Sequence, residues 1–279
     1  MKVSDWRAGL ASATAYGLLT VGLALAGSLV GWLLLSSWLD LSWWRIFRRC
    51  ASSAAVIALW WRVKRSEGRT FSSYGVSRFR AGKGELAEGL LLGSFVLAGL
   101  LLAGLASGSV YIRITEETFR LWRTVILFIP GALLVAVIEE AVFRGYLLEH
   151  LSRVSKAFGI ITTSAIFAVI HLREHTLHAA AWRELAGLFL LGSVLALAAL
   201  RSRGLWLPIG LHAALAYGAR VNKHLVDFQD LSWSWLTGTS RLVNGLASWT
   251  ALLLLAGCLV ARTGRSSSAE QPAGGQRSD

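Results

Sequence analysis

Residues 124–148 read TVILFIPGALLVAVIEEAVFRGYLL, and this stretch decides the fold. It is long and apolar enough to cross roughly 30 Å of hydrocarbon as a single helix. Two adjacent glutamates, Glu139 and Glu140, nevertheless lie inside it, and Arg144 follows one turn later. A carboxylate near the centre of a bilayer costs roughly 2.5–3.5 kcal/mol on insertion scales. A membrane helix that carries two carboxylates is therefore expected to use them.

Composition places the rest of the chain in the membrane as well. Of its 279 residues, 54% are hydrophobic and 16% are charged, and the mean hydropathy is +0.55. These values exclude disorder and disfavour a soluble domain. We expect an all-α fold, a polytopic transmembrane helical bundle of about eight helices. The predicted helices are 9–36, 48–62, 88–111, 123–149, 157–172, 185–201, 204–221 and 243–261.

The predicted helices divide the chain into four parts. Residues 1–120 hold N-terminal transmembrane helices and a basic loop, and residues 121–222 hold the polar membrane residues and form the candidate catalytic core. A loop and the last transmembrane helix follow in 223–261, and the Ser, Gly, Gln and Pro content of 262–279 predicts a disordered tail. The first apolar stretch far exceeds the roughly 7–15 residues of a signal peptide, so we expect a retained helix.

The net charge of +12 comes mostly from Lys and Arg in the loops between apolar runs. In a membrane protein such loops report orientation and contact with the lipid bilayer, so we expect no nucleic-acid partner. With eight spans, the basic residues modestly favour the side of both termini. We therefore expect a protein of the bacterial inner membrane with cytoplasmic termini. If helix 48–62, whose start is crowded by Arg45, Arg48 and Arg49, does not span, the N-terminus lies on the opposite side.

Polar side chains recur inside three of the predicted spans. Glu140 and Arg144 are four residues apart on one helix face, where an ion pair is natural. Glu139 points about 100° away from Glu140 and has no cation three or four residues from it. His171 and His212 are likewise embedded in apolar sequence on two further helices. This asymmetry predicts that Glu140 is structural and that Glu139 faces a cavity.

Helix rise places three of these side chains at similar depths. From the predicted loop at 150–156, Glu139 lies about 17 Å deep and His171 about 22 Å deep, while His212 lies about 14 Å from the same face. We therefore expect a shared site. A glutamate beside a neutral imidazole can deprotonate water for attack on a carbonyl. Alternatively, the three side chains can hold a divalent metal.

Two more histidines, His175 and His178, follow His171 at helical spacing. They lie beyond Arg173, where the apolar run has ended. We interpret them as interfacial residues rather than metal ligands.

The ordered motifs resemble the CPBP family of intramembrane proteases, which includes type II CAAX prenyl endopeptidases and bacteriocin-processing and immunity proteins. They are the EExxxR run from Glu139 to Arg144, the FxxxH run from Phe167 to His171, and His212. The resemblance covers about residues 125–220. It implies a glutamic-type protease without a metal cofactor, in which Glu139 and His171 activate the attacking water. It further implies that His212 stabilises the oxyanion. Glu140, Arg144 and Phe167 would then support the site.

One position departs from the family pattern. The family's last motif is HxxxN, but the fourth residue after His212 is Ala216. One oxyanion donor is worth about 2.7–4 kcal/mol in other hydrolases. The leading hypothesis is an intramembrane endopeptidase that cuts a membrane-associated protein or peptide. The alternative is a weak or inactive relative that acts as a bacteriocin-immunity or chaperone-like membrane protein. A proton-coupled transporter is disfavoured because no inverted repeat is visible.

Overall fold

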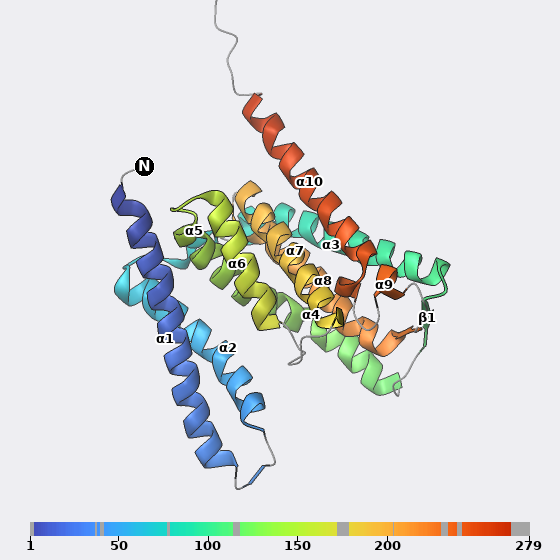
Figure 1. Cartoon of the computed structure of the whole chain (residues 1–279), viewed down its shortest axis with the longest axis horizontal. Coiled ribbons are helices and arrows are strands. Elements are labelled where there is room, and N and C mark those ends of the chain that lie inside the picture. The colour runs from blue at the N-terminus through green and yellow to red at the C-terminus, as the bar shows by residue number, and fades with distance from the viewer. Residues whose placement is uncertain are drawn as a thin grey trace, which may run out of the picture.

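A computed structural model gives the fold for residues 3–36, 38–39, 42–76, 79–113, 118–171, 179–202, 204–229, 234–238 and 242–268. Within these residues, one long helical segment corresponds to each predicted helix (Figure 1), and the all-α fold class is confirmed. The long helices are α1 (Val3–Leu35), α2 (Trp43–Trp61), α3 (Phe79–Ala106), α4 (Thr118–Glu140), α6 (Lys156–His171), α7 (Ala179–Arg201), α8 (Trp206–Leu225) and α10 (Leu246–Ser268).

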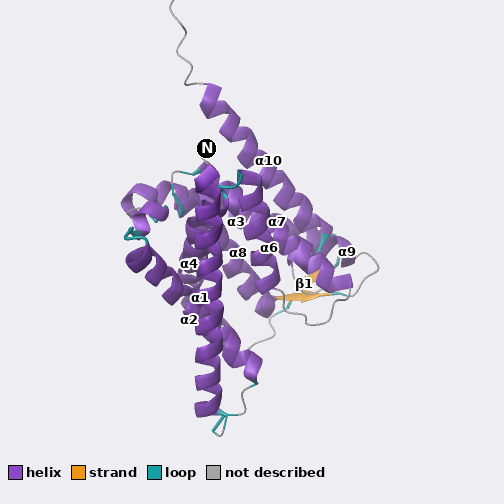
Figure 2. Cartoon of the chain, turned by 60° about the vertical axis from the view of Figure 1, so that its left-hand side comes forward, coloured by secondary structure: helices purple, strands orange, loops and turns teal. Residues whose placement is uncertain are grey.

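Short elements join or extend these helices. Helix α4 continues without a break through the π-helix η3 (Ala141–Leu147) into α5 (Leu148–Leu151). The other short elements are the π-helix η1 (Arg62–Ser66), the 3₁₀ helices η2 (Phe71–Tyr74) and η4 (Leu242–Asn244), helix α9 (Ser234–Thr237), and strands β1 (Val110–Ile112) and β2 (Val226–Phe228). Strands β1 and β2 pair antiparallel, with Val110 opposite Phe228, and tie the end of α3 to the end of α8 (Figure 2).

The protein is an integral membrane protein. Four helical stretches of the described chain are long and apolar enough to cross a membrane: Asp5–Leu35, Phe71–Ala106, Leu121–Leu151 and Ala181–Arg201. Lys156–His171 and Leu246–Ala261 are shorter apolar helices. Helix α2, the weakest of the predicted spans, does not meet these criteria. It packs along α1, where Gly27 faces Cys50 and Gly31 faces Ile46.

Helices α1 and α2 form a hairpin that projects from the rest of the bundle (Figure 1). At 33 residues, α1 is roughly 50 Å long, which exceeds the hydrocarbon thickness. The outer face of the hairpin is apolar, with exposed leucines on α1 and exposed tryptophans at both ends of α2. An apolar outer face is the expected surface for lipid contact.

Helices α3 and α8 approach each other so closely that their backbones touch. A Cβ added to Gly89 would lie 2.2 Å from the carbonyl oxygen of Leu207, and one added to Gly210 would lie 2.3 Å from that of Leu86. Small residues permit this contact between membrane helices. Helix α8 also packs on α4, so two helices fix the position of the helix that carries His212.

Several helices extend beyond their predicted bounds, most of all at the start of α3 and the end of α10. Helix α3 begins at Phe79 rather than at residue 88, because charged and small residues extend the helix beyond the apolar run. At its other end, α3 stops at Ala106 rather than at residue 111, because Val110–Ile112 form strand β1. Helix α10 continues to Ser268, so the first part of the predicted disordered tail is helical. The helical backbone hydrogen bonding continues beyond the apolar runs of both helices. A prediction from hydropathy alone therefore makes both helices too short at these ends. Residues 269–279 lie outside the described residues.

Candidate functional site

The candidate site is assembled from the ends or middles of three helices. Glu139 and Glu140 are the last two residues of α4, directly before the chain widens into the π-helix η3. His171 is the last residue of α6, and His212 lies in the second turn of α8. The structure brings all four side chains together from these separate elements. Long π-helical segments are rare and are frequently found at functional sites.

Glu139 faces both histidines. Its Oε2 atom lies 3.3 Å from Nε2 of His171 and 3.7 Å from Nε2 of His212. The side chains of Glu139 and His171 are partly exposed, at 25% and 31%, whereas that of His212 is 7% exposed. Glu139, which the sequence predicts to face a cavity, is thus the more accessible of the two glutamates.

Glu140 is fully buried and joins two partners. Its Oε1 atom accepts a hydrogen bond from Nη1 of Arg144 at 3.1 Å and another from Nδ1 of His212 at 2.7 Å. The second guanidinium nitrogen of Arg144, Nη2, donates to the carbonyl oxygen of Gly192 at 3.0 Å. A buried charge needs such pairing and hydrogen bonding to be tolerated. Glu140 and Arg144 therefore form a structural pair that also orients His212.

Phe167 fills the centre of this arrangement and is buried. Its ring lies 4.2 Å from the ring of His171 and 4.8 Å from the guanidinium carbon of Arg144, which sits over its face. Phe143 meets the same ring edge to face at 5.5 Å. A cation over an aromatic face is attracted by the ring quadrupole. Phe167 therefore contacts Arg144 of the buried ion pair and also His171, the partner of the accessible Glu139.

The hydrogen bonds of the two histidines define which ring nitrogens face Glu139. Nδ1 of His171 lies 2.8 Å from the carbonyl oxygen of Phe167, which can only accept. Nδ1 of His212 donates to Glu140 in the same way. Both rings therefore hold a proton on Nδ1, and both present Nε2 to Glu139.

Ala216 lies one turn beyond His212 on α8 and presents only a methyl group. The side-chain amide of the resembled motif is therefore missing at this position. Asn222, further along the same helix, is ten residues beyond His212, or about 15 Å. That separation is too large for Asn222 to take the same place.

Sequence reasoning missed two of the contacts that hold the site. The hydrogen bond between Glu140 and His212 joins residues 72 positions apart, and the carbonyl of Gly192 supports Arg144 across 48 positions. Local sequence patterns predict neither contact. The first joins side chains that are far apart in the chain, and the second uses a backbone carbonyl, which every residue has. His175 and His178 lie outside the described residues.

Metal binding was the open alternative for these side chains. Across the described parts of the chain, no group of three His, Cys, Asp or Glu side chains has the geometry to hold a metal ion. Glu139, His171 and His212 are among these described residues and do not form such a group.

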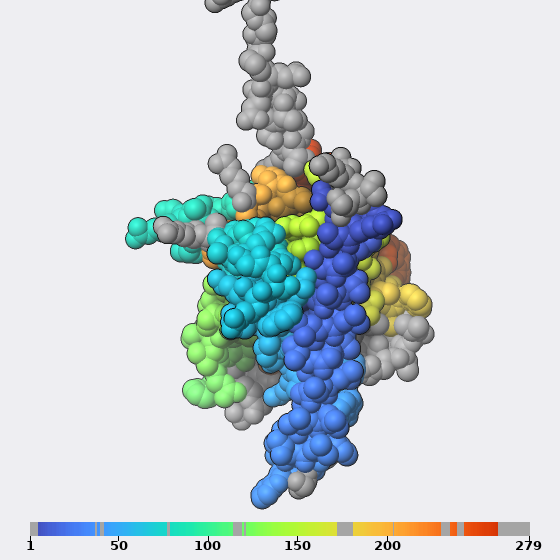
Figure 3. Space-filling view, turned by 90° about the vertical axis from the view of Figure 1, so that its left-hand side faces the viewer, coloured from blue at the N-terminus to red at the C-terminus, as the bar shows by residue number. Residues whose placement is uncertain are grey.

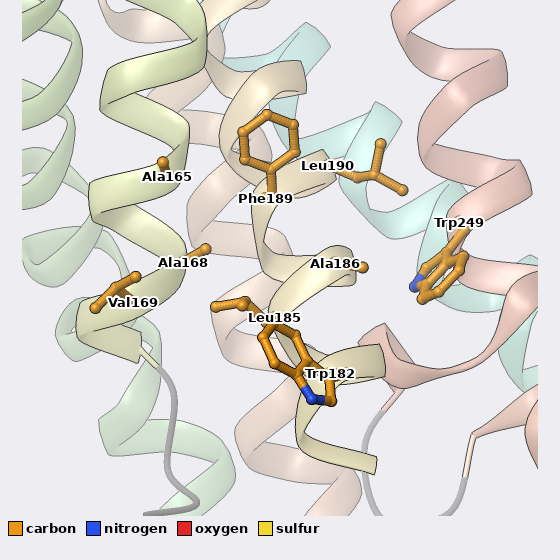
Figure 4. Close-up of a pocket in the computed structure, with 9 residues that line it drawn as sticks. All are labelled: Ala165, Ala168, Val169, Trp182, Leu185, Ala186, Phe189, Leu190 and Trp249. Atoms are coloured by element: carbon orange, nitrogen blue, oxygen red, sulfur yellow. The ribbon is translucent and has the colours of Figure 1, made fainter. Parts of the chain in front are cut away.

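An apolar pocket of about 450 Å³ lies between α6, α7 and α10 (Figure 4). Ala168, Leu185, Trp182 and Trp249 are among the side chains that line it. The pocket is lined by apolar and aromatic side chains, so it supplies no acid or base to the site.

Residues 121–217 match the family model described as Rce1-like, type II CAAX prenyl endopeptidase Rce1-like. The matched segment contains every site residue discussed above. No curated protein matches the chain.

Proposed function

We propose that this protein, whose residues 121–217 match the model of the Rce1-like, type II CAAX prenyl endopeptidase family, hydrolyses a peptide bond of a membrane-associated protein or peptide. The attacking nucleophile is a water molecule activated by Glu139 and His171. The observation that carries the proposal is the convergence of Glu139 Oε2 with Nε2 of His171 and Nε2 of His212, within 3.3 and 3.7 Å.

The hydrogen-bonding character of these atoms supports a bound water. With both Nδ1 atoms protonated, each neutral imidazole offers only a lone pair at Nε2, and the carboxylate of Glu139 is also an acceptor. Three acceptors that face one another need donors between them. A water molecule supplies two hydrogens, to Glu139 and to His171. One further proton, at Nε2 of His212, completes the arrangement.

Each residue then has a distinct role in the reaction. Glu139 removes a proton from the water as its oxygen attacks the peptide carbonyl, with His171 orienting the water through its second hydrogen. The carbonyl oxygen becomes an oxyanion, which accepts the hydrogen bond from the proton on Nε2 of His212. Glu139 returns its proton to the leaving amine when the carbon–nitrogen bond breaks.

Glu140 and Arg144 act at one remove from the reacting atoms. Glu140 pairs with the imidazole ring of His212 once that ring carries two protons. Arg144 in turn keeps the Glu140 carboxylate paired inside the protein. Both side chains are fully buried, so neither is within reach of a substrate. Their role is to fix the histidine that faces the developing negative charge.

The charge of the loops supports a proposal for the orientation of the chain. We place both termini in the cytoplasm of a bacterial cell, because basic residues are more numerous on the side of both termini when α2 crosses the membrane. Reporter fusions at the C-terminus and in the loop between α3 and α4 test this topology. A C-terminal reporter that is active only outside the cytoplasm would contradict it.

A second candidate function is favoured by Ala216. Without the family's amide at that position, the protein can serve as a non-catalytic bacteriocin-immunity or chaperone-like membrane protein. The two functions separate in cells that depend on the protein for a phenotype. An endopeptidase loses the phenotype in both the Glu139→Ala and His171→Ala variants. A non-catalytic protein keeps it in both, provided that the variants accumulate to wild-type levels.

A further inference from the structure

A second buried polar cluster surrounds Tyr146, near the end of the π-helix η3. The Tyr146 side chain is fully buried. Its hydroxyl donates a hydrogen bond to Oε1 of Glu67 at 2.7 Å and accepts one from Nε of Arg62 at 3.0 Å. Its carbonyl oxygen accepts a hydrogen bond from Nδ1 of His150 at 2.8 Å. Tyr146 is thus held at both its side chain and its backbone.

Glu67 is the centre of this cluster and comes from a different part of the chain. It follows η1, in the segment between α2 and α3 that lies against α1 on one face of the molecule (Figure 3). Besides Tyr146, it accepts a hydrogen bond from the hydroxyl of Tyr74. Arg62 and Nε2 of His150 both lie 3.5 Å from Oε1 of Glu67. One carboxylate therefore joins three elements around the π-helix.

The charge on Glu67 is favoured where it sits. Burial alone raises the pKa of the Glu67 carboxyl, but hydrogen bonds from two tyrosines and nearby positive charges outweigh burial. The pKa of Glu67 therefore lies below its ordinary value. A charged acceptor makes stronger hydrogen bonds than a neutral one. The hydrogen bond from Tyr146 to Glu67 is correspondingly strong.

The π-helix connects this cluster to the candidate site. Glu140 directly precedes η3, Arg144 lies within it, and Tyr146 follows Arg144 by two residues. A π-helical turn is wider than an α-helical turn and is seldom formed over several residues without outside support. A rotation of η3 that released Tyr146 would also move Arg144 away from Glu140. The contacts of Tyr146 and the ion pair that orients His212 are therefore carried by the same π-helix.

We propose that Glu67, which lies outside the family-matched segment, and Tyr146, which lies within the π-helix, are positioning residues: their hydrogen bond clamps the π-helix and so holds Arg144, Glu140 and His212 in place. This inference rests on the proposed hydrolysis for its kinetic readout. Glu67 lies in the chain before residue 121, where the family match begins. The N-terminal part of the chain thereby contributes to the site without touching the reacting atoms.

The test compares matched removals of tyrosine hydroxyls. Tyr146→Phe removes the hydroxyl that meets Glu67, whereas Tyr16→Phe removes a neighbouring hydroxyl that donates to the carbonyl of Ala55 at 3.2 Å. The ring of Tyr16 lies 5.2 Å from that of Tyr146, so both changes affect the same core. Rates are measured on a farnesylated reporter peptide in proteoliposomes, together with Tm for each variant.

We expect Tyr146→Phe and Glu67→Ala each to lower kcat about tenfold with KM within about twofold of wild type. The double variant falls no further than either single variant, because both remove one shared interaction. Tyr16→Phe lowers Tm similarly but leaves kcat unchanged. Glu67→Gln, whose amide oxygen still accepts from Tyr146, keeps the wild-type kcat. Losses of kcat that multiply in the double variant would overturn the proposal, as would an equal loss of kcat in Tyr16→Phe.

A spectroscopic readout separates this inference from the proposed hydrolysis. In protein labelled with ¹⁵N-histidine, the ring signals of His212 report its hydrogen bond to Glu140. We expect these signals to shift in Tyr146→Phe and to stay in place in Tyr16→Phe. If the wild type cleaves no peptide, the proposed hydrolysis fails. The His212 signals alone then show whether Tyr146 positions His212. Unchanged His212 signals in Tyr146→Phe would then overturn it.

Discussion

Glu140 accepts a hydrogen bond of 2.7 Å from Nδ1 of His212, across 72 positions of the chain. The same oxygen pairs with Arg144 at 3.1 Å. Glu140 is therefore the link between the structural half of the site and the histidine that faces Glu139. The two adjacent glutamates differ in their surroundings because α4 turns one toward a buried cation and the other toward an accessible space.

Removing the Glu140 carboxylate should unfold the protein more readily than removing that of Glu139. The Glu140→Leu variant leaves Arg144 buried without a counterion, and breaking a buried pair in this way costs about 3–5 kcal/mol. Thermal unfolding in detergent should show a large fall in Tm for Glu140→Leu and a small one for Glu139→Leu. The double variant Glu140→Leu/Arg144→Met should recover much of the loss. Equal Tm values for the two glutamate variants would contradict the structural role of Glu140.

Restoring the missing amide should raise the rate. In the Ala216→Asn variant, an amide returns one turn beyond His212, where it can donate a hydrogen bond to the oxyanion. One such donor changes kcat by about 10²–10³ in other hydrolases, and we expect a gain of at least tenfold here. Ala219→Asn places the same side chain on an exposed part of α8 and serves as the control. A rate that stays at the wild-type value in Ala216→Asn would show that the oxyanion is stabilised without this position.

Glu67 should stabilise the protein in a pH-dependent manner. Because the pKa of its carboxyl is lowered in the folded state, its contribution is complete above the ordinary value of 4.5. The contribution is lost as the pH falls through the folded-state pKa. The Tm of Glu67→Gln should therefore lie about 2 °C or more below wild type near pH 7, and the gap should narrow as the pH falls below 4.5. A gap that widens on acidification would contradict the lowered pKa.

Chelation separates the proposed water activation from metal-assisted hydrolysis. We expect protein dialysed against a chelator to keep its cleavage rate, because Glu139 and His171 activate the water directly. The same dialysis of a known zinc peptidase serves as the control for metal removal. Activity that disappears on dialysis and returns with added Zn²⁺ would instead assign Glu139, His171 and His212 as ligands.

The sequence was a good guide to the helices and to one ion pair. Each predicted span has a helix in the structure, because hydrophobic length is a strong signal in membrane proteins. The pair formed by Glu140 and Arg144 follows from spacing on one helix. Helix rise also placed Glu139, His171 and His212 at similar depths, although their approach to within 3.7 Å requires the tertiary packing of α4, α6 and α8.

The contacts that escaped sequence analysis are long-range. Glu67 and Tyr146 are 79 positions apart, and nothing in the basic segment around Glu67 marks it as a partner for a membrane helix. The π-helix was also invisible, because residues 141–147 carry the same apolar pattern as the α-helix before them. Close packing of α3 on α8 depends on where glycines meet, which spacing within a single helix does not determine.

The most direct test of the central claim is the cleavage rate of the Glu139→Gln variant on a farnesylated reporter peptide. Glutamine keeps the shape of the side chain but cannot take a proton from water. The account predicts that kcat falls by about 10²–10⁴ relative to wild type, while Tm stays close to that of the wild type. Cleavage by Glu139→Gln at the wild-type rate would contradict it.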